Sequence, residues 1–313
     1  MRVATNSYSA AMLNQFNTLV SQQDNLQSEV SSGLSVQAPA NNPGAMETTL
    51  DDLAGQAAQT QYNTNITTLQ TRATSVYNAM DSLQKLTSNI ESIATSASSG
   101  TTSQATLTND ATTVQQAIQQ ALELANAQDS AGSYLFGGTA STSPPFTATT
   151  DASGNITGVT YSGNSSVNKV PVSATASVSI DVPGANTTGT GTPGLITDSQ
   201  SGADLFNHLL ALQTDLAAGN QTAVVADAAE LQKDDSNLIS QIATNGAVQT
   251  RLTNAATFAT TQATGLATMI ANASSTDLVQ TMVQLNQAQT SYQAALQSSA
   301  KIMQLSLLNY LPT

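Results

Sequence analysis

The chain has 313 residues, with seven Lys or Arg against twenty Asp or Glu, so its formal net charge is −13. The basic residues are scattered singly, which leaves no basic patch for nucleic acid or an anionic membrane surface. Apolar residues make up 40% of the chain but aromatic residues only 4%, which favours long thin helices with small interface residues over a domain with a deep catalytic pocket.

The first predicted element is an amphipathic helix over 8–30. Its apolar residues step by four, three, seven and four positions, which places them on one face of a helix. They are Met12, Phe16, Leu19, Leu26 and Val30. A seam this narrow needs a second helix of similar length to cover it.

A turn is expected after the first helix, because Gly33 suits a helix end and Pro39 and Pro43 push the residues before them into extended conformations. A long helix is predicted from about Ala45 to Ala97. Its apolar residues recur every seven positions, the period of a coiled coil. These residues are Tyr62, Leu69, Val76, Leu83 and Ile90, with Ile66, Ala73 and Met80 on the alternating position.

The run 98–102 ends that helix, and a further helix is predicted from Leu107 to about Asp129. Its apolar residues are Leu107, Ala111, Val114, Ile118, Ala121 and Ala125. Because the connection is short, we expect the two helices to be antiparallel neighbours.

Helical periodicity disappears over 132–202, where five of the eight prolines lie. Short runs rich in β-forming residues replace it at 156–161, 169–172 and 176–182. We interpret this segment as a small β-rich insert between helices.

The helical pattern returns at Ala203 and stops at Gly219 and Asn220. A long helical segment then runs from Thr222 to about Ala271. Asn245 and Gly246 interrupt this segment. A local kink and a turn that ends one helix are the two interpretations, and the kink is favoured.

The last segment, 276–310, is again an amphipathic helix. Its predicted stripe consists of Leu278, Met282, Leu285, Tyr292, Leu296 and Met303, and Ala288 and Gln289 interrupt it. Two matched seams at opposite ends of the chain predict a coiled coil formed by the terminal helices. We expect Leu285, Tyr292, Leu296 and Met303 to contact Met12, Leu19 and Leu26.

The predicted fold is mainly α with a β-rich insert, in the form of an elongated antiparallel helical bundle whose terminal helices pair at one pole. Three domains are expected. They are a terminal assembly domain (1–44 and 276–313), a rod of long helices (45–131 and 203–275) and an outward-facing insert (132–202).

Few residues offer catalytic chemistry. The chain has no Cys, which excludes disulfides and thiolate chemistry, and its one histidine, His208, is expected to pack on a helix surface. The adjacent carboxylates at 51–52 and 234–235 point about 100° apart on a helix, so we expect solvated faces instead of an acid–base pair. We therefore expect no enzyme activity, no metal and no cofactor.

No segment has eighteen consecutive apolar residues, so we expect no membrane insertion. The first residues form no apolar run followed by a cleavage site, and we expect no cleaved signal of the ordinary kind.

The polar faces of the end helices carry almost no charge. Beyond Asp277 the charged side chain is Lys301, and residues 1–40 have Arg2, Asp24 and Glu29. Uncharged polar faces favour repeated packing against copies or relatives. The alternative is that these uncharged faces only reflect the composition of the whole chain, which is poor in charged residues.

The sequence resembles members of the bacterial flagellin superfamily, and most closely the family of hook-associated protein 3. The resemblance is carried by Met1-Arg2-Val3, 26–33, 38–43, 132–138 (Gly-Ser-Tyr-Leu-Phe-Gly-Gly), Pro144-Pro145-Phe146, 245–252 and 305–311.

The resemblance implies a secreted, extracellular structural protein that joins hook to filament and is exported unfolded through the flagellar type III apparatus. Its implied partners are hook-associated protein 1, flagellin, copies of itself and an export chaperone. The expected assembly interface comprises the two terminal stripes together with Leu308.

Two other functions remain open from the sequence. The chain could be a flagellin filament subunit, which belongs to the same structural class. It could also be a secreted adhesin or enzyme that acts through its β-rich insert.

Overall fold

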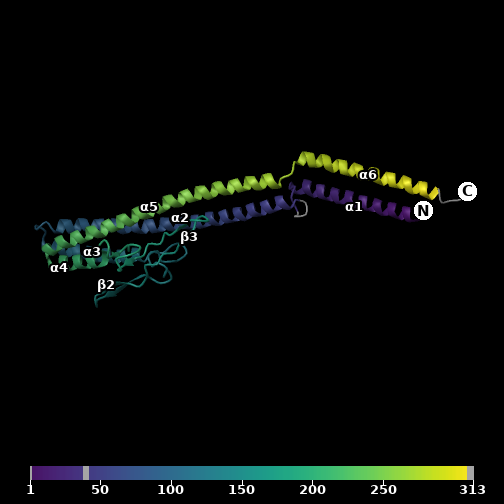
Figure 1. Ribbon diagram of the computed structural model, residues 1–313. Helices are drawn as coiled ribbons and strands as arrows, with labels where there is room; N and C mark the ends of the chain where they lie inside the picture. Colours follow the sequence, from purple (N-terminus) through teal and green to yellow (C-terminus); the bar gives the residue numbers. More distant parts are fainter. Residues whose placement is uncertain (1, 38–41, 309–313) are drawn as a thin grey trace. The chain divides into compact units, whose positions relative to one another are not determined.

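The computed structural model describes residues 2–37 and 42–308, and it describes side chains over 10–37 and 42–301 (Figure 1). The expected architecture, mainly α with a small β part, is confirmed. The chain forms two compact units, one of Met1–Ala58 with Thr261–Thr313 and one of Gln59–Thr260. In the described part of the chain, no helix is both long and apolar enough to cross a bilayer.

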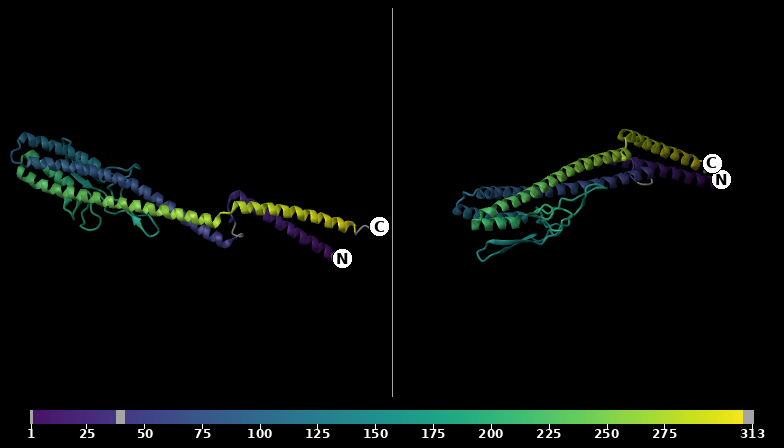
Figure 2. Two further views of the ribbon diagram at one scale, coloured as in Figure 1. Left: turned by 90° about the horizontal axis from the view of Figure 1, so that it is seen from above. Right: turned by 60° about the vertical axis from the view of Figure 1, so that its left-hand side comes forward.

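The first unit contains helices α1 (Arg2–Ser32) and α6 (Leu278–Leu308), with the start of α2 (Pro43–Ala97) and the end of α5 (Gln221–Ser274). Helices α1 and α6 lie side by side and run antiparallel, so both ends of the chain are at the same end of the pair (Figures 1 and 2). The predicted pairing of the terminal helices is therefore confirmed.

The inner ends of this helix pair are tied together by backbone hydrogen bonds. Gly33 adopts a left-handed φ of 72° at the end of α1, as expected for a terminating glycine. The Ser35 N–H donates to Ser274 O at 2.7 Å, and the Thr276 N–H donates to Gly33 O at 3.0 Å. Much of the predicted turn, residues 38–41, lies outside the described residues.

The second unit is built around the rest of α2, α3 (Gln104–Ala125), α4 (Leu205–Ala218) and the first part of α5. Of the predicted heptad residues of α2, those from Val76 to Ile90 are buried in one apolar core that four helices share. Its members include Val76, Met80 and Leu83 of α2, Val114 and Ile118 of α3, Leu209 and Leu212 of α4, and Leu231 and Leu238 of α5. Ile66, Leu69 and Ala73 are buried in a second, smaller cluster, and Tyr62 is half-buried. The long-helix predictions are confirmed.

Helix α3 is shorter than predicted, and helix α5 has no break at Asn245 and Gly246. Helix α3 ends at Ala125, four residues before the predicted limit, because Asp129 Oδ1 accepts hydrogen bonds from the N–H groups of Ala131 and Ser133 in a turn. Helix α5 continues through Asn245 and Gly246, so a helix-ending turn there is wrong. Asn245 is buried, and its Oδ1 accepts a hydrogen bond from Gln249 Nε2 one turn later on the same helix.

The β part has three small sheets. Strand β1 (Phe146–Thr150) pairs antiparallel with β2 (Ile156–Tyr161), and β3 (Val170–Pro171) pairs antiparallel with β4 (Ser177–Val178). In the third sheet β6 (Thr197–Asp198) is central, parallel to β5 (Ala185–Asn186) and antiparallel to β7 (Ala203–Asp204). The run 156–161 is confirmed as a strand, whereas the runs 169–172 and 176–182 are strands over two residues each.

The β part packs directly on the helices of the second unit. The ring of Phe146 lies 5.0 Å from that of Tyr161 and 5.6 Å from that of Phe206 on α4, measured between centroids. Arg72 of α2 forms ion pairs with Asp129 at 3.2 Å and with Asp181 at 3.3 Å. These contacts fix the insert against the helix bundle.

Candidate functional site

The seam of α1 follows a regular spacing of four and three residues. Its half-buried or buried members are Met12, Phe16, Leu19, Gln23, Leu26 and Val30. All five residues predicted for this seam belong to it, and a single polar residue, Gln23, completes the heptad pattern.

The seam of α6 differs from the predicted stripe. Its members are Thr281, Leu285, Ala288, Gln289, Tyr292, Ala295 and Ser299, which are buried or half-buried. Leu285 and Tyr292 are shared with the prediction, but Leu278, Met282 and Leu296 are each about half exposed. The side chains of Met303 and Leu308 lie outside those described.

The predicted stripe and the observed seam of α6 differ because of residue size. Ala288, Ala295 and Ser299 are small, which allows the backbones of two helices to approach closely. A stripe drawn through the largest apolar residues therefore takes Met282 and Leu296 in place of the seam residues Thr281 and Ala295, one position away. The four-three spacing from Thr281 to Ser299 is the sequence signal that would have identified it.

Phe16 and Tyr292 form the aromatic contact of the helix pair. Their ring centroids are 5.8 Å apart and the ring planes meet at 80°, an edge-to-face arrangement. A pocket of about 240 Å³ adjoins Phe16 and is lined in part by Met12, Ala295 and Ser299. The single chain therefore leaves this seam incompletely filled.

Several apolar side chains of the helix pair lie outside the seam. Near the start of α6 they form an exposed surface patch, which consists of Leu278, Val279, Met282 and Val283. Val279 is 75% exposed and Val283 is 60% exposed. Leu296 on α6 and Leu13 and Val20 on α1 are exposed as well. Contiguous exposed apolar residues of this kind mark interaction surfaces.

His208 connects α4 to α5, which agrees with the expected packing role. Its Nδ1 lies 2.8 Å from Asp234 Oδ2, and its Nε2 lies 3.8 Å from Glu230 Oε2. The hydrogen bond to Asp234 raises the pKa of His208 above its ordinary value. The expected solvation of Asp234 is wrong, because this carboxylate is 1% exposed and also accepts a hydrogen bond from the Asp204 N–H.

A second carboxyl group beside this cluster is perturbed. Burial, together with the neighbouring carboxylate of Asp215, raises the pKa of Asp227 to about 6. Across the residues with described side chains, no three His, Asp or Glu groups converge as metal ligands. The side chains of His208, Asp227, Glu230 and Asp234 link α4 to α5. They do not form a nucleophile or an acid–base pair arranged around a common substrate position.

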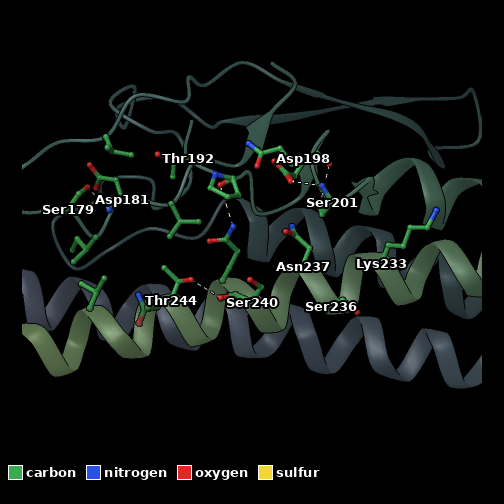
Figure 3. Close-up of a pocket in the computed structure, with 18 of the residues that line it drawn as sticks. Ser179, Asp181, Thr192, Asp198, Ser201, Lys233, Ser236, Asn237, Ser240 and Thr244 are labelled. Carbon is green, nitrogen blue, oxygen red and sulfur yellow. Dashed lines mark hydrogen bonds between the residues drawn. The ribbon is translucent and has the colours of Figure 1, made fainter. Parts of the chain in front are cut away.

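A groove with both polar and apolar lining lies between α5 and the segment from Ser179 to Ser201, within the second unit (Figure 3). Its volume is about 870 Å³. Hydroxyl and carboxamide side chains of α5 form one wall, among them Asn237, Ser240 and Gln241. The sequence predicted no site here.

No family model and no curated protein sequence matches the chain. Solved structures do. A provisionally assigned flagellar hook-associated protein from Vibrio parahaemolyticus superposes with a TM-score of 0.64 at 18% identity, over 75% of this chain and 100% of that one. The chain has the hook-associated protein fold.

Two further solved structures with this fold superpose on the chain to a similar extent. FlgL of Xanthomonas campestris matches with a TM-score of 0.57 at 18% identity, over 69% of this chain and 98% of that one. Flagellar hook-associated protein-3 of Legionella pneumophila matches with a TM-score of 0.51 at 13% identity, over 73% and 97%. At these identities the likeness establishes the hook-associated protein fold and leaves the function to be argued from the surfaces.

Proposed function

We propose that this chain is a non-enzymatic structural subunit of the bacterial flagellum that joins the hook to the filament. One observation carries the proposal: a chain with the hook-associated protein fold leaves an apolar patch at 278–283 uncovered on the helix that pairs with its own N-terminal helix. The patch is the surface through which the terminal helices polymerise.

The energetics favour polymerisation over an isolated chain. Apolar surface removed from water contributes about 25 cal/mol per Å², and side chains such as Val279 and Met282 are at least half exposed in the single chain. The neighbouring polar residues of α6 carry hydroxyls and amides instead of charges, so covering them requires no buried ion pair.

The proposed partners are copies of this chain, hook-associated protein 1 on the hook side and flagellin on the filament side. An export chaperone would cover the apolar patch before assembly, and the protein would be secreted through the flagellar type III apparatus to an extracellular position. In this arrangement the long helices form a rod layer and the β-rich insert faces outward.

Deletion of residues 278–313 tests the proposal. The truncated chain should retain the thermal unfolding of the second unit, whose core uses no residue of α6, but it should no longer enter flagella. Incorporation of the truncated protein at the normal level would contradict the proposal.

A flagellin-type role predicts a different result. Purified full-length protein would then form long homopolymeric filaments, whereas a junction subunit should be found at a single position in electron micrographs of labelled flagella. Label along the whole filament would replace the proposal with the flagellin role.

A further inference from the structure

The groove between α5 and the segment 179–201 contains an unusual row of side chains on α5. Asn237, Gln241 and Asn245 follow one another at intervals of four residues, so they lie on one face of the helix. Each lines the groove, and they are only 5%, 7% and 4% exposed. Buried carboxamides are normally hydrogen-bonded at both their oxygen and their nitrogen.

Each of these carboxamides has a partner for one of its two groups. Asn237 Nδ2 donates to carbonyl oxygens in 193–195 at 2.9 Å, and Gln241 Nε2 donates to the same segment at 3.4 Å. Asn245 Oδ1 accepts from Gln249. Within the described residues no protein group bonds to the Asn237 or Gln241 side-chain oxygen or to Asn245 Nδ2.

The facing wall has a backbone segment with no backbone partner, in which the Asp181 N–H donates to Ser179 Oγ at 3.3 Å. Residues 179–182 follow β4, line the groove and form no backbone–backbone hydrogen bond with any described residue. The side chains of Ile180 and Val182 are buried, so the segment alternates in the manner of a strand. An unpaired extended edge is a surface to which another strand can add.

Each charged group that lines the groove already has a partner within the chain. Asp181 is paired with Arg72, and Lys233 donates to Glu230 at 2.7 Å. The carboxylate of Asp198 accepts from the backbone N–H groups of Gly194 and Ser201. A charged ligand would find no unpaired partner here, so the groove favours an uncharged one.

We propose that the groove binds an extended, uncharged polypeptide segment from a partner protein. The partner's backbone pairs with the edge at 179–182 and completes the hydrogen bonds of the carboxamides on α5. The spacing fits, because four helical residues rise about 6 Å and two extended residues span about 6.6 Å. This site belongs to the second unit and does not depend on the function proposed for the terminal helices.

The test uses the full-length chain and a fluorescein-labelled, capped hexapeptide of alternating Thr and Ala. Fluorescence anisotropy should show saturable binding, and hydrogen exchange should show protection of 179–182 when the peptide is bound. A hexapeptide of alternating Lys and Glu and the sugar maltohexaose should compete at least about tenfold less well than the unlabelled peptide. Absence of saturable binding, or stronger competition by the sugar, would overturn the proposal.

Two variants separate the groove from the rest of α5. Ser240 is exposed and lines the groove, so Ser240→Trp should fill it and weaken binding at least about tenfold. Ala243 is exposed on the same helix but does not line the groove, so Ala243→Trp should leave binding unchanged.

If Ser240→Trp alters the circular dichroism spectrum, Gln241→Met provides the second measurement, because it removes one carboxamide while keeping the side-chain length. It should weaken binding by about fivefold or more, the value of one hydrogen bond. Equal binding by the wild type and a folded groove variant, or binding without protection of 179–182, would refute strand addition.

Discussion

Phe16 of α1 and Tyr292 of α6 contact each other edge to face across the terminal helix pair, although 275 positions separate them in the sequence. The contact joins two helices that have little charge to align them. An aromatic pair in this geometry contributes about 1 kcal/mol beyond the area it buries.

The first prediction is a double-mutant cycle at this pair. Phe16→Leu and Tyr292→Leu should each destabilise the helix pair, and the double variant should be less destabilised than the sum, by about 1 kcal/mol. Hydrogen exchange of the α6 amides measures the effect. Strict additivity would show that the rings are not energetically coupled.

The second prediction concerns the apolar patch at 278–283. Met282→Glu places a charge at an exposed position, so the free energy of unfolding should change by no more than about 0.5 kcal/mol. Under the proposed function, incorporation into flagella should nevertheless be lost, because assembly through the patch would bury the charge without a partner. Motility and electron microscopy of a complemented deletion strain measure this.

Gln287→Glu is the matched control for that experiment. Gln287 is exposed on the same helix outside the apolar patch, and the substitution introduces the same charge. Assembly should tolerate it. Equal loss in both variants would point to a general sensitivity to charge instead of to the patch.

The third prediction is a pH dependence from His208. The hydrogen bond with Asp234 raises the pKa of His208 in the folded chain, and the carboxylates of Asp204 and Glu230 act in the same direction. Protonated His208 therefore stabilises the fold fully below its unfolded pKa of about 6.5, and this stabilisation is lost as the pH rises through the folded pKa. In His208→Gln, denaturant unfolding should lack this decline.

Asp227 provides an internal check on that measurement. Its pKa is raised to about 6 in the folded chain, so protonated Asp227 stabilises the fold at low pH. This contribution to the free energy of unfolding is lost as the pH rises from about 4 to 6, below the range in which His208 titrates. His208→Gln should retain the decline in that lower range. Loss of both declines in His208→Gln would indicate that the two groups titrate as one unit.

The fourth prediction compares two glycines at α4 and α5. Gly219 ends α4 with a left-handed φ of 72°, and an added Cβ would meet the side chain of Gln104. Gly219→Ala should destabilise the second unit by about 1 kcal/mol or more. Gly246 is helical with open space around its Cα, so Gly246→Ala should stabilise by about 0.5 to 1 kcal/mol. Thermal unfolding measures both.

How far the sequence predicted the fold depended on side-chain size and element length. The apolar members of the α1 seam were all predicted because large apolar residues such as Met12, Phe16 and Leu19 follow the four-three spacing of a helix face, whereas Gln23 gave no hydrophobic signal. The seam of α6 was misplaced because Ala288 and Ser299 carry little hydrophobic signal. Strands of two residues are too short for an alternating pattern, so most of the β part could not be placed from periodicity.

The candidate groove could not be predicted for a different reason. Asn237, Gln241 and Asn245 resemble the many other polar residues of the long helices until tertiary structure brings the segment 193–195 against them. Burial of a carboxamide depends on contacts between distant segments, which a single sequence does not reveal.

The buried hydroxyls of α6 do not depend on the neighbouring helix for their hydrogen bonds. Thr281 Oγ1 donates to Asp277 O at 2.9 Å and Ser299 Oγ donates to Ala295 O at 2.6 Å, both within their own helical turn. No polar atom of these two side chains would be stranded if α1 were exchanged for a helix of another molecule. The C-terminal helix could therefore exchange α1 for a helix of another molecule without losing the hydrogen bonds of these buried hydroxyls.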